Sequence, residues 1–401
     1  MSPMRVSSLV AIVLLLLTLA AQGVGANMKG KKQLKVLFYY RFSDSLLMRP
    51  RPPLPSGQMY TIDLDAAPEE RWREVAQDHK NYIRAMLDAC DLIFETGTRI
   101  CCVILENPTV VKQISEAIRL PSELVYEMKG IASVVDVSYK KVLVGNIFYE
   151  LSRFSNILSF SERACTSIVA QHRNGTIYHA RNQDYPRLFA PLMVRVRFVR
   201  NKGELVFTGT TFAGTVGIMT GMAVNGFGVS IDARADKGNI TQFVAAAAAG
   251  ASVLNSSTSY TDALSKFSTI PMISTGYIIL SGIYPGEGAV ITSRIEWCGS
   301  LRYLIPAIFY QTAPTSQSWF RVETNYDHDS PPPATDDRRD PAVRAMEAIG
   351  RDNISLAALW EVLSSPPVFN KHTIHTDLLV SAWGEYRSYK RHVILDQQQN
   401  A

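Results

Sequence analysis

The spacing of apolar residues divides the chain into a helical first part and a second part rich in strands. Apolar residues recur at helical spacing from Pro68 to about Gly130, and a proline followed by acidic residues is a typical helix start. The pattern predicts a second helical region over about 110–130. It also predicts a third, strongly apolar helix from Tyr139 to Phe160.

Strand-like runs begin at Cys165. They fill residues 165–234, where Gly, Asn and Asp interrupt them, and one of them is expected to end at Gly209. Further on, the pattern predicts helix over 240–266, strands over 273–293, a loop over 329–333 and helix over 340–364. A helical start followed by alternating strand and helix blocks predicts one α+β unit with a helical lobe attached.

The first 26 residues have the features of a secretory signal peptide. Arg5 precedes the apolar run Leu9–Leu19, and small residues follow up to Ala26. The apolar run is shorter than the roughly 20 residues that a membrane span needs, so we expect cleavage rather than anchoring. Four Asn-x-Ser/Thr sequons agree with a secretory route and give candidate glycosylation sites at Asn174, Asn239, Asn255 and Asn353.

Charge and cysteine content narrow the range of partners. The net charge is +5 over 401 residues, and the Lys and Arg residues are scattered, which argues against a nucleic-acid partner. No spacing of cysteine and histidine suggests a zinc site, so we expect neither a metal nor a cofactor. The five cysteines are an odd number, so an oxidising compartment leaves one thiol free unless two chains pair.

Cys165 is the candidate for a reactive thiol, and a predicted hairpin places charged residues near it. Asn174-Gly175 is a favoured two-residue turn between two strand-like runs. With this turn, Cys165 faces Asp184 across the hairpin. Arg181 then faces Ile168 and has the wrong parity for the Cys165 face, so a bulge or a strand end would be needed to turn it inward.

The predicted arrangement lacks the histidine that usually serves a catalytic cysteine. His172 lies next to the turn, His179 lies within the second strand, and nothing requires His328 to approach. A cut between Ala164 and Cys165 would supply a different base, because the new α-amino group can take the proton of its own side chain. Asp184 could then hold the amino group. Arg181 could stabilise the sulfur, because a nearby cation lowers the pKa of a thiol.

Ordered sequence blocks connect these residues to a known family. They cover nearly the whole chain after the signal peptide and are Tyr60–Leu64, Pro68–Trp72, Gly130–Ala132, Asn146–Glu150, Cys165–Pro186, Phe207–Gly214, Glu323–Asp327 and Asp336–Arg339. With this set the chain resembles the acid ceramidase and N-acylethanolamine-hydrolysing acid amidase family. That family lies within the cholylglycine-hydrolase group of N-terminal-nucleophile hydrolases.

The resemblance implies a role for each matching residue. Cys165 matches the family's nucleophile, which autoproteolysis of the Ala164–Cys165 bond frees in an acidic lumen. Arg181 and Asp184 match the residues that position and tune it. Asn325 matches an oxyanion-hole asparagine, and Arg338 matches a further active-site arginine.

The resemblance also implies the fold, the processing and the location. We expect an αββα sandwich with a helical N-terminal lobe, made as a precursor with a signal peptide (1–26), an N-terminal chain (27–164) and a catalytic chain (165–401). The two chains are expected to stay together as a heterodimer and to hydrolyse a lipid amide in the lysosome, with secretion as a second destination. The apolar N-terminal helices are most simply core, and the resemblance adds a peripheral membrane contact for them.

Two departures from the family pattern bear on the substrate. Ala233 stands where the family has a glutamate, and Met219 stands where the amidase branch tends to have tryptophan. The blocks 319–328 and 184–186 look closer to the N-acylethanolamine amidases, whereas 212–214 and Met219 lean toward the ceramidases, so N-acylethanolamines are the favoured substrates and ceramides the alternative. The lost glutamate also keeps open a non-catalytic lipid-binding glycoprotein.

Overall fold

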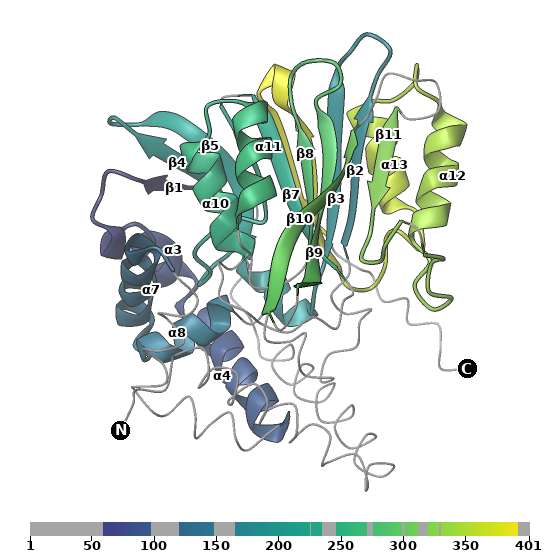
Figure 1. Cartoon of the computed structure of the whole chain (residues 1–401). Coiled ribbons are helices and arrows are strands. Elements are labelled where there is room, and N and C mark those ends of the chain that lie inside the picture. Colours follow the sequence, from purple (N-terminus) through teal and green to yellow (C-terminus); the bar gives the residue numbers. More distant parts are fainter. Residues whose placement is uncertain are drawn as a thin grey trace, which may run out of the picture.

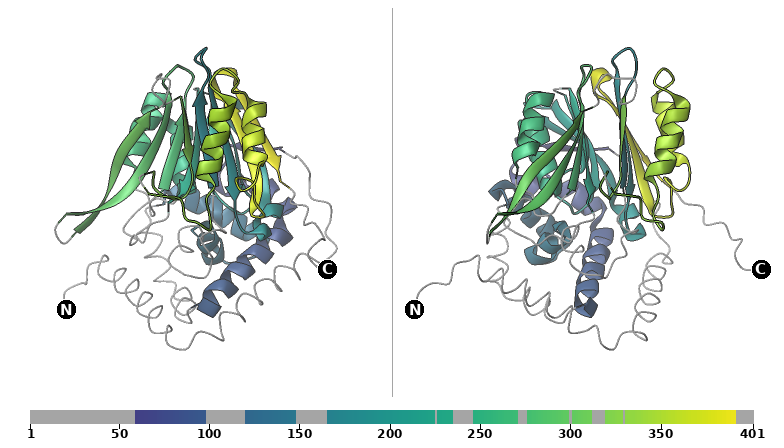
Figure 2. Two further views of the ribbon diagram at one scale, coloured as in Figure 1. Left: turned by 90° about the vertical axis from the view of Figure 1, so that its right-hand side faces the viewer. Right: turned by 45° about the vertical axis from the view of Figure 1, so that its right-hand side comes forward.

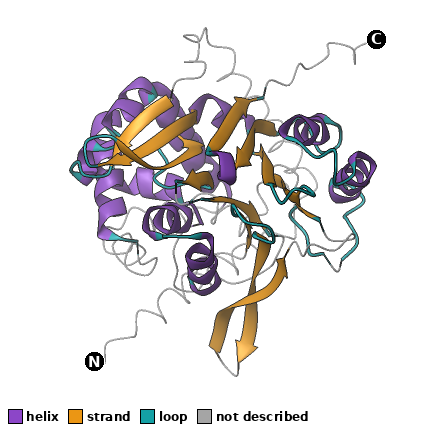
Figure 3. Ribbon diagram, turned by 90° about the horizontal axis from the view of Figure 1, so that it is seen from above, coloured by secondary structure: helices purple, strands orange, loops and turns teal. Residues whose placement is uncertain are grey.

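Two β-sheets lie face to face, and helices cover the outer face of each (Figures 1 and 3). The computed structural model describes residues 59–97, 120–147, 165–224, 226–234, 246–270, 276–298, 301–311, 319–328 and 330–391. Helices α10 (Ala246–Ser256) and α11 (Tyr260–Thr269) pack on one sheet, and α12 (Arg339–Ile349) and α13 (Leu356–Ser364) pack on the other. Figure 2 shows the four layers in order. The predicted αββα sandwich is confirmed.

Both sheets are antiparallel, except that the edge strand β1 runs parallel to β4. The eight-stranded sheet contains, in spatial order, β1 (Met59–Asp63), β4 (Met193–Arg200), β5 (Glu204–Phe212), β6 (Thr220–Ala223), β7 (Phe227–Ala233), β8 (Gly276–Ser281), β9 (Gly288–Cys298) and β10 (Leu301–Gln311). The five-stranded sheet contains β11 (Phe320–Glu323), β2 (Cys165–Gln171), β3 (Ile177–Asp184), β12 (Thr373–Val380) and β13 (Glu385–Lys390).

Strand β2 is buried on both faces, because one face packs against the eight-stranded sheet and the other packs against the helices that cover the five-stranded sheet. Val169 packs against Tyr277 and Ile279 of the eight-stranded sheet. Ile168, one residue earlier, belongs to the cluster that includes Leu359 of α13. Alternate residues of the strand therefore face opposite layers, and every second side chain from Cys165 points between the sheets.

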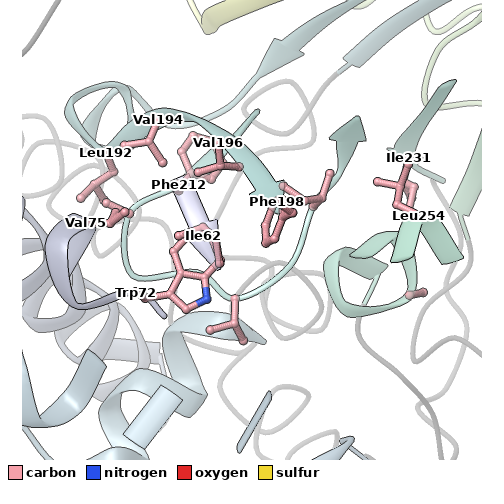
Figure 4. Packing of buried hydrophobic residues seen from close by; sticks show 14 of the residues in the cluster. Ile62, Trp72, Val75, Leu192, Val194, Val196, Phe198, Phe212, Ile231 and Leu254 are labelled. Carbon is pink, nitrogen blue, oxygen red and sulfur yellow. The ribbon is translucent and has the colours of Figure 1, made fainter. Parts of the chain in front are cut away.

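The N-terminal lobe packs against one end of the eight-stranded sheet. It contains η2 (Pro68–Glu70), α3 (Arg73–Asp78), α4 (Lys80–Gly97), α7 (Ser122–Val135) and α8 (Tyr139–Asn146). The indole of Trp72 is buried, donates from Nε1 to Glu127 at 2.8 Å and lies 5.9 Å from the ring of Phe198, centroid to centroid. Figure 4 shows part of this core, with Trp72, Ile62 and Phe198 labelled.

Most predicted elements are present, with corrections. The strand expected to end at Gly209 continues to Phe212, because the glycine lets β6 approach: an added Cβ would lie 2.7 Å from the carbonyl oxygen of Thr220. The predicted helix 340–364 is two helices, separated near Gly350, whose φ is 75°. Strands β1, β10, β11, β12 and β13 were not predicted.

Other predictions lie outside the described residues: the signal peptide 1–26, the segments 98–119 and 148–164, and the starts of the predicted helix and strands at 240–245 and 273–275. Within the described parts of the chain, no helix is long and apolar enough to cross a membrane.

Candidate active site

The hairpin of β2 and β3 sets which side chains meet the thiol of Cys165. Its loop has three residues, not two, because the backbone N–H of His172 donates to the carbonyl oxygen of Thr176 at 2.9 Å and leaves Arg173-Asn174-Gly175 as the loop. Gly175 takes a φ of 95°, as expected for the left-handed third residue of such a loop. The predicted Asn-Gly turn is therefore wrong by one residue.

The corrected register brings Arg181 to the face of the nucleophile. Cys165 is opposite Gln183, and Ser167 is opposite Arg181, so Cys165 and Arg181 point to the same side of the sheet. The guanidinium Nη2 of Arg181 donates to Cys165 Sγ at 3.2 Å. No bulge is needed, and the predicted proximity of these two residues is confirmed with a different register.

The same shift turns Asp184 away from the thiol. Asp184 lies opposite Thr373 of β12, whose Oγ1 donates to Asp184 Oδ1 at 2.6 Å, and Asn370 Nδ2 donates to Oδ2 at 2.7 Å. The expectation that Asp184 faces Cys165 across the hairpin is therefore wrong. Burial raises the pKa of Asp184 to about 6, against the opposing effect of Arg338.

A different carboxylate, Asp232 at the end of β7, faces the thiol from the opposite sheet. Its Oδ1 lies 3.0 Å from Nε of Arg181, and both side chains are fully buried. Arg181 also donates to the carbonyl oxygen of Ile231 at 2.8 Å and to Thr220 Oγ1. The guanidinium thus bridges the carboxylate of Asp232 and the sulfur of Cys165.

Burial has a larger effect on the pKa of the Cys165 thiol than the neighbouring guanidinium of Arg181 does. Cys165 is a free, buried cysteine, and burial raises its pKa to about 12, although Arg181 opposes the shift. The expected lowering of this pKa by Arg181 is outweighed. A group that accepts the proton as the sulfur attacks is therefore required.

Asn325 and Arg338 fix the backbone at the start of β2. Asn325 Oδ1 accepts from the backbone nitrogen of Cys165 at 2.7 Å and from Nη2 of Arg338 at 2.8 Å. Asn325 Nδ2 donates to the carbonyl oxygen of Ala233 at 2.7 Å, which uses one of its two hydrogens. Arg338 also donates to the carbonyl oxygen of Cys165 and to Thr166 Oγ1.

Two ionic contacts hold the loop that carries Asn325. On one side, Arg234 donates to both carboxylate oxygens of Asp327, at 2.6 and 2.5 Å. On the other, Glu323 Oε2 lies 2.8 Å from His328 Nε2. Burial raises the pKa of Glu323 to about 7, with His328 acting in the opposite direction. His328 thus supports this loop and is not a partner of the thiol.

Asp232 was not identified from the sequence as a site residue. The available signal was the alternation in β7, where Ser230 and Asp232 share one face while Val229 and Ile231 belong to the apolar core. A charged residue within a strand that is apolar on its other face indicates a buried ion pair. The position of its partner follows only from the packing of the two sheets.

The candidate glycosylation sites are only partly described. Asn174 and Asn353 are exposed, Asn255 is half-buried, and Asn239 lies outside the described residues, so glycosylation stays a prediction. In the part of the chain that the structure covers, no group of three or more His, Cys, Asp or Glu residues is placed to bind a metal ion.

Known proteins are similar to this sequence over most of its length. Residues 58–96 match the family model of the beta subunit of N-acylethanolamine-hydrolyzing acid amidase, and this segment lies before Cys165. The N-acylethanolamine-hydrolyzing acid amidase of Rattus norvegicus is 37% identical over 361 residues, which are 87% of this chain and 92% of that relative. The acid ceramidase of Pan troglodytes is 30% identical over 373 residues, 85% of this chain and 87% of the relative.

A solved structure of the Caenorhabditis elegans ortholog of N-acylethanolamine-hydrolyzing acid amidase also matches. It is 32% identical, with a TM-score of 0.47, and the match covers 54% of this chain and 93% of that one.

Proposed function

Because the chain belongs to the N-acylethanolamine-hydrolysing acid amidase family, we propose that it is an amidohydrolase that cleaves N-acylethanolamines into fatty acid and ethanolamine. The observation that carries the chemistry is the contact of Cys165 Sγ with Arg181 Nη2 at the first residue of a buried strand. A thiol at this position becomes the first side chain of a new chain if the backbone is cut directly before it.

A cut between Ala164 and Cys165 would create the base of the mature enzyme. The nitrogen of Cys165 already lies 2.7 Å from Asn325 Oδ1, so the free amino group would be held at the site by that oxygen. An α-amino group has a reference pKa of about 7.7–8.0, so it can take and return a proton in the course of the reaction.

The amide hydrolysis then proceeds in two halves. Cys165 Sγ attacks the amide carbon while the α-amino group takes the thiol proton, and the remaining N–H of Asn325 Nδ2 donates to the oxyanion. The proton passes to the leaving amine, which departs and leaves a thioester. Water hydrolyses the thioester to the fatty acid and restores the thiol. Arg338 positions both the Cys165 carbonyl and Asn325 throughout.

Contacts across the cleavage point support a lasting heterodimer of residues 27–164 and 165–401. Strand β1 belongs to the N-terminal part and pairs with β4 of the catalytic part. Asn146 of α8 accepts from the backbone N–H of Val216 at 2.7 Å and donates to the carbonyl oxygen of Gly214 at 2.9 Å. The N-terminal chain thus completes the sheet and remains bound after the cut.

The raised pKa values of Asp184 and Glu323 support operation in an acidic lumen such as the lysosome. Burial raises them to about 6 and about 7, so the protonated forms are favoured in mild acid. Neutral carboxyl groups tolerate burial better than carboxylates. Acidic surroundings therefore suit the folded site.

The test begins with the purified precursor at mildly acidic pH. A new N-terminus at Cys165 is expected, with none in the Cys165→Ala control. The matured enzyme is then offered palmitoylethanolamide and a short-chain ceramide, and faster hydrolysis of palmitoylethanolamide is expected. Preference for ceramide would assign the protein to the acid ceramidase reaction. No cut and no labelling by a thiol-directed acylating agent would indicate a lipid-binding protein instead.

A further inference from the structure

The self-cleaving step needs a base, and the α-amino group that serves as the base of the mature enzyme does not yet exist in the uncut chain. In the uncut chain the nitrogen of Cys165 is an amide, and an amide nitrogen does not accept a proton at mild pH. The α-amino group is a product of the cut and cannot assist it. Since burial raises the pKa of the thiol to about 12, a second group must remove its proton during the first attack.

We propose that Asp232 is the general base of this self-cleaving step. The proposal rests on the N-terminal-nucleophile function given above and adds the residue that starts it. Asp232 is fully buried, faces Cys165 from the opposite sheet, and its carboxylate interacts with the thiol and with the hydroxyl of Ser167. The ion pair with Arg181, Nε to Oδ1 at 3.0 Å, favours the anionic form of the carboxylate beside the sulfur, against burial, which raises the pKa of Asp232.

The other acidic residues near the site, Asp184 and Glu323, are bound by other partners. Both oxygens of Asp184 accept hydrogen bonds, from Thr373 and from Asn370, on the face of the sheet away from the thiol. Glu323 accepts from the backbone nitrogen of Thr324 at 3.0 Å and pairs with His328. Asp232 is therefore the carboxylate that faces the sulfur among the described residues.

The cleavage balances with Asp232 and one water molecule. Asp232 takes the proton of Cys165 Sγ as the sulfur bonds to the carbonyl carbon of Ala164. The bond from that carbon to the Cys165 nitrogen then breaks, and Asp232 returns the proton to this nitrogen. The product is a thioester between Ala164 and Cys165. Water hydrolyses it, which leaves the Ala164 carboxylate and the free thiol, with no change of oxidation state.

A buried series of hydrogen bonds begins at Ser167, the hydroxyl that acts on Asp232. Ser167 Oγ lies 3.0 Å from Ser230 Oγ, which lies 2.9 Å from His179 Nε2, and His179 Nδ1 lies 3.0 Å from Ser281 Oγ. Burial lowers the pKa of His179 to about 3, so the ring is neutral and donates from one nitrogen only.

Each serine hydroxyl in this series of hydrogen bonds has one proton, so all the donors point the same way along the series. When Asp232 is ionised, Nε2–H of His179 donates to Ser230 and Ser230 donates to Ser167, which orients the hydroxyl proton of Ser167 toward the carboxylate. The series therefore favours the basic form of Asp232. His179 acts here as a positioning residue, and the sequence did not indicate it because it reaches Asp232 only through two serines.

The first test measures the rate at which the Cys165 N-terminus appears in full-length precursors. Asp232→Asn keeps the shape of the side chain and is expected to slow self-cleavage by about 10²–10⁴-fold, the usual contribution of a general base. Asp262→Asn is the control, because this carboxylate pairs with Lys266 on the outer helix α11, away from the thiol, and it is expected to cleave within a few-fold of the unmodified precursor. Cleavage of Asp232→Asn at the unmodified rate would overturn the proposal.

A second variant, Ser167→Ala, keeps the ion pair between Arg181 and Asp232 and tests the proposal if Asp232→Asn does not fold. Several groups act on Asp232: Arg181 of β3, Arg338 before α12, Glu323 of β11, and Cys165 and Ser167 of β2. Ser167→Ala removes one donor, which raises the pKa of Asp232 and moves the acidic limb of the self-cleavage profile to higher pH. Ser257→Ala, at another buried serine, is the control. An unshifted limb in Ser167→Ala would contradict the role of Asp232.

The unmodified precursor separates this assignment from the proposed function. A recognition site for an added protease, placed so that the protease cuts directly before Cys165, gives mature enzyme by a second route. An unmodified precursor that never cuts itself refutes the N-terminal-nucleophile function. Full self-cleavage by Asp232→Asn refutes only the role of Asp232.

Discussion

Replacing Arg181 with methionine keeps the unbranched stem of the side chain and removes a buried cation from between the two sheets. The guanidinium pairs with Asp232 through Nε at 3.0 Å and donates to the carbonyl oxygen of Ile231 at 2.8 Å. After the substitution, Asp232 remains as a charge without a counter-ion in a site that is fully buried. The variant is therefore expected to lose both folding stability and self-cleavage.

The size of the loss follows from these contacts. Removing one partner of a buried ion pair costs about 3–5 kcal/mol. A backbone carbonyl that loses its donor adds roughly 1 kcal/mol, for a total of about 4–6 kcal/mol. The double variant Arg181→Met, Asp232→Asn has no lone charge and should recover about 2–4 kcal/mol of this, but no activity.

Urea unfolding measures both variants in a Cys165→Ala background, so that every protein stays uncut. Arg173→Met is the matched control, because Arg173 pairs with Asp352 on the exposed hairpin tip, and its unfolding midpoint is expected to stay unchanged. A cost below about 1 kcal/mol for Arg181→Met, or no recovery in the double variant, would show that Asp232 is not an ionised partner. That result would also remove the basis for its role as a base.

Three further variants test other parts of the structure. Because burial raises the pKa of Glu323 from 4.5 to about 7, its contribution to stability is full below about pH 4.5 and is lost as the pH rises through 7. The melting temperature should therefore fall between these values, and Glu323→Gln should flatten the dependence. Gly130→Ala would place a Cβ 2.0 Å from the carbonyl oxygen of Glu69 and should lower the melting temperature by separating α7 from η2. Gly175→Ala is strained at a φ of 95° and should cost about 1–2 kcal/mol in urea unfolding; an unchanged midpoint would contradict the left-handed loop.

The sequence was sufficient to bring Cys165 and Arg181 together but not to orient them. The short segment between them, with strand-like residues on both sides of a turn, indicates one hairpin. Asn-Gly, however, occurs both in two-residue turns and at the end of three-residue loops, where the glycine is left-handed. The preference of the dipeptide is the same in both cases, so the choice of register depends on the packing of the strands between the sheet and the helices.

Asp232 could not be predicted for a different reason. It approaches Cys165 only because β7 and β2 belong to different sheets that lie face to face. Local propensity carries no information on how two sheets are stacked. The αββα architecture came from the resemblance to a family, and even that did not specify which polar residues of β7 meet the thiol.

The loop Arg173-Asn174-Gly175 has a consequence for anyone who adds an affinity tag or a reporter to this protein. Arg173 and Asn174 are exposed, so the tip looks tolerant of insertion. An added segment is harmless there as long as His172 still pairs with Thr176. If the pairing slips by a single residue, every side chain of β3 changes face, Arg181 leaves the thiol and Asn182 takes its place, so an insertion that shifts the register removes activity and core packing together.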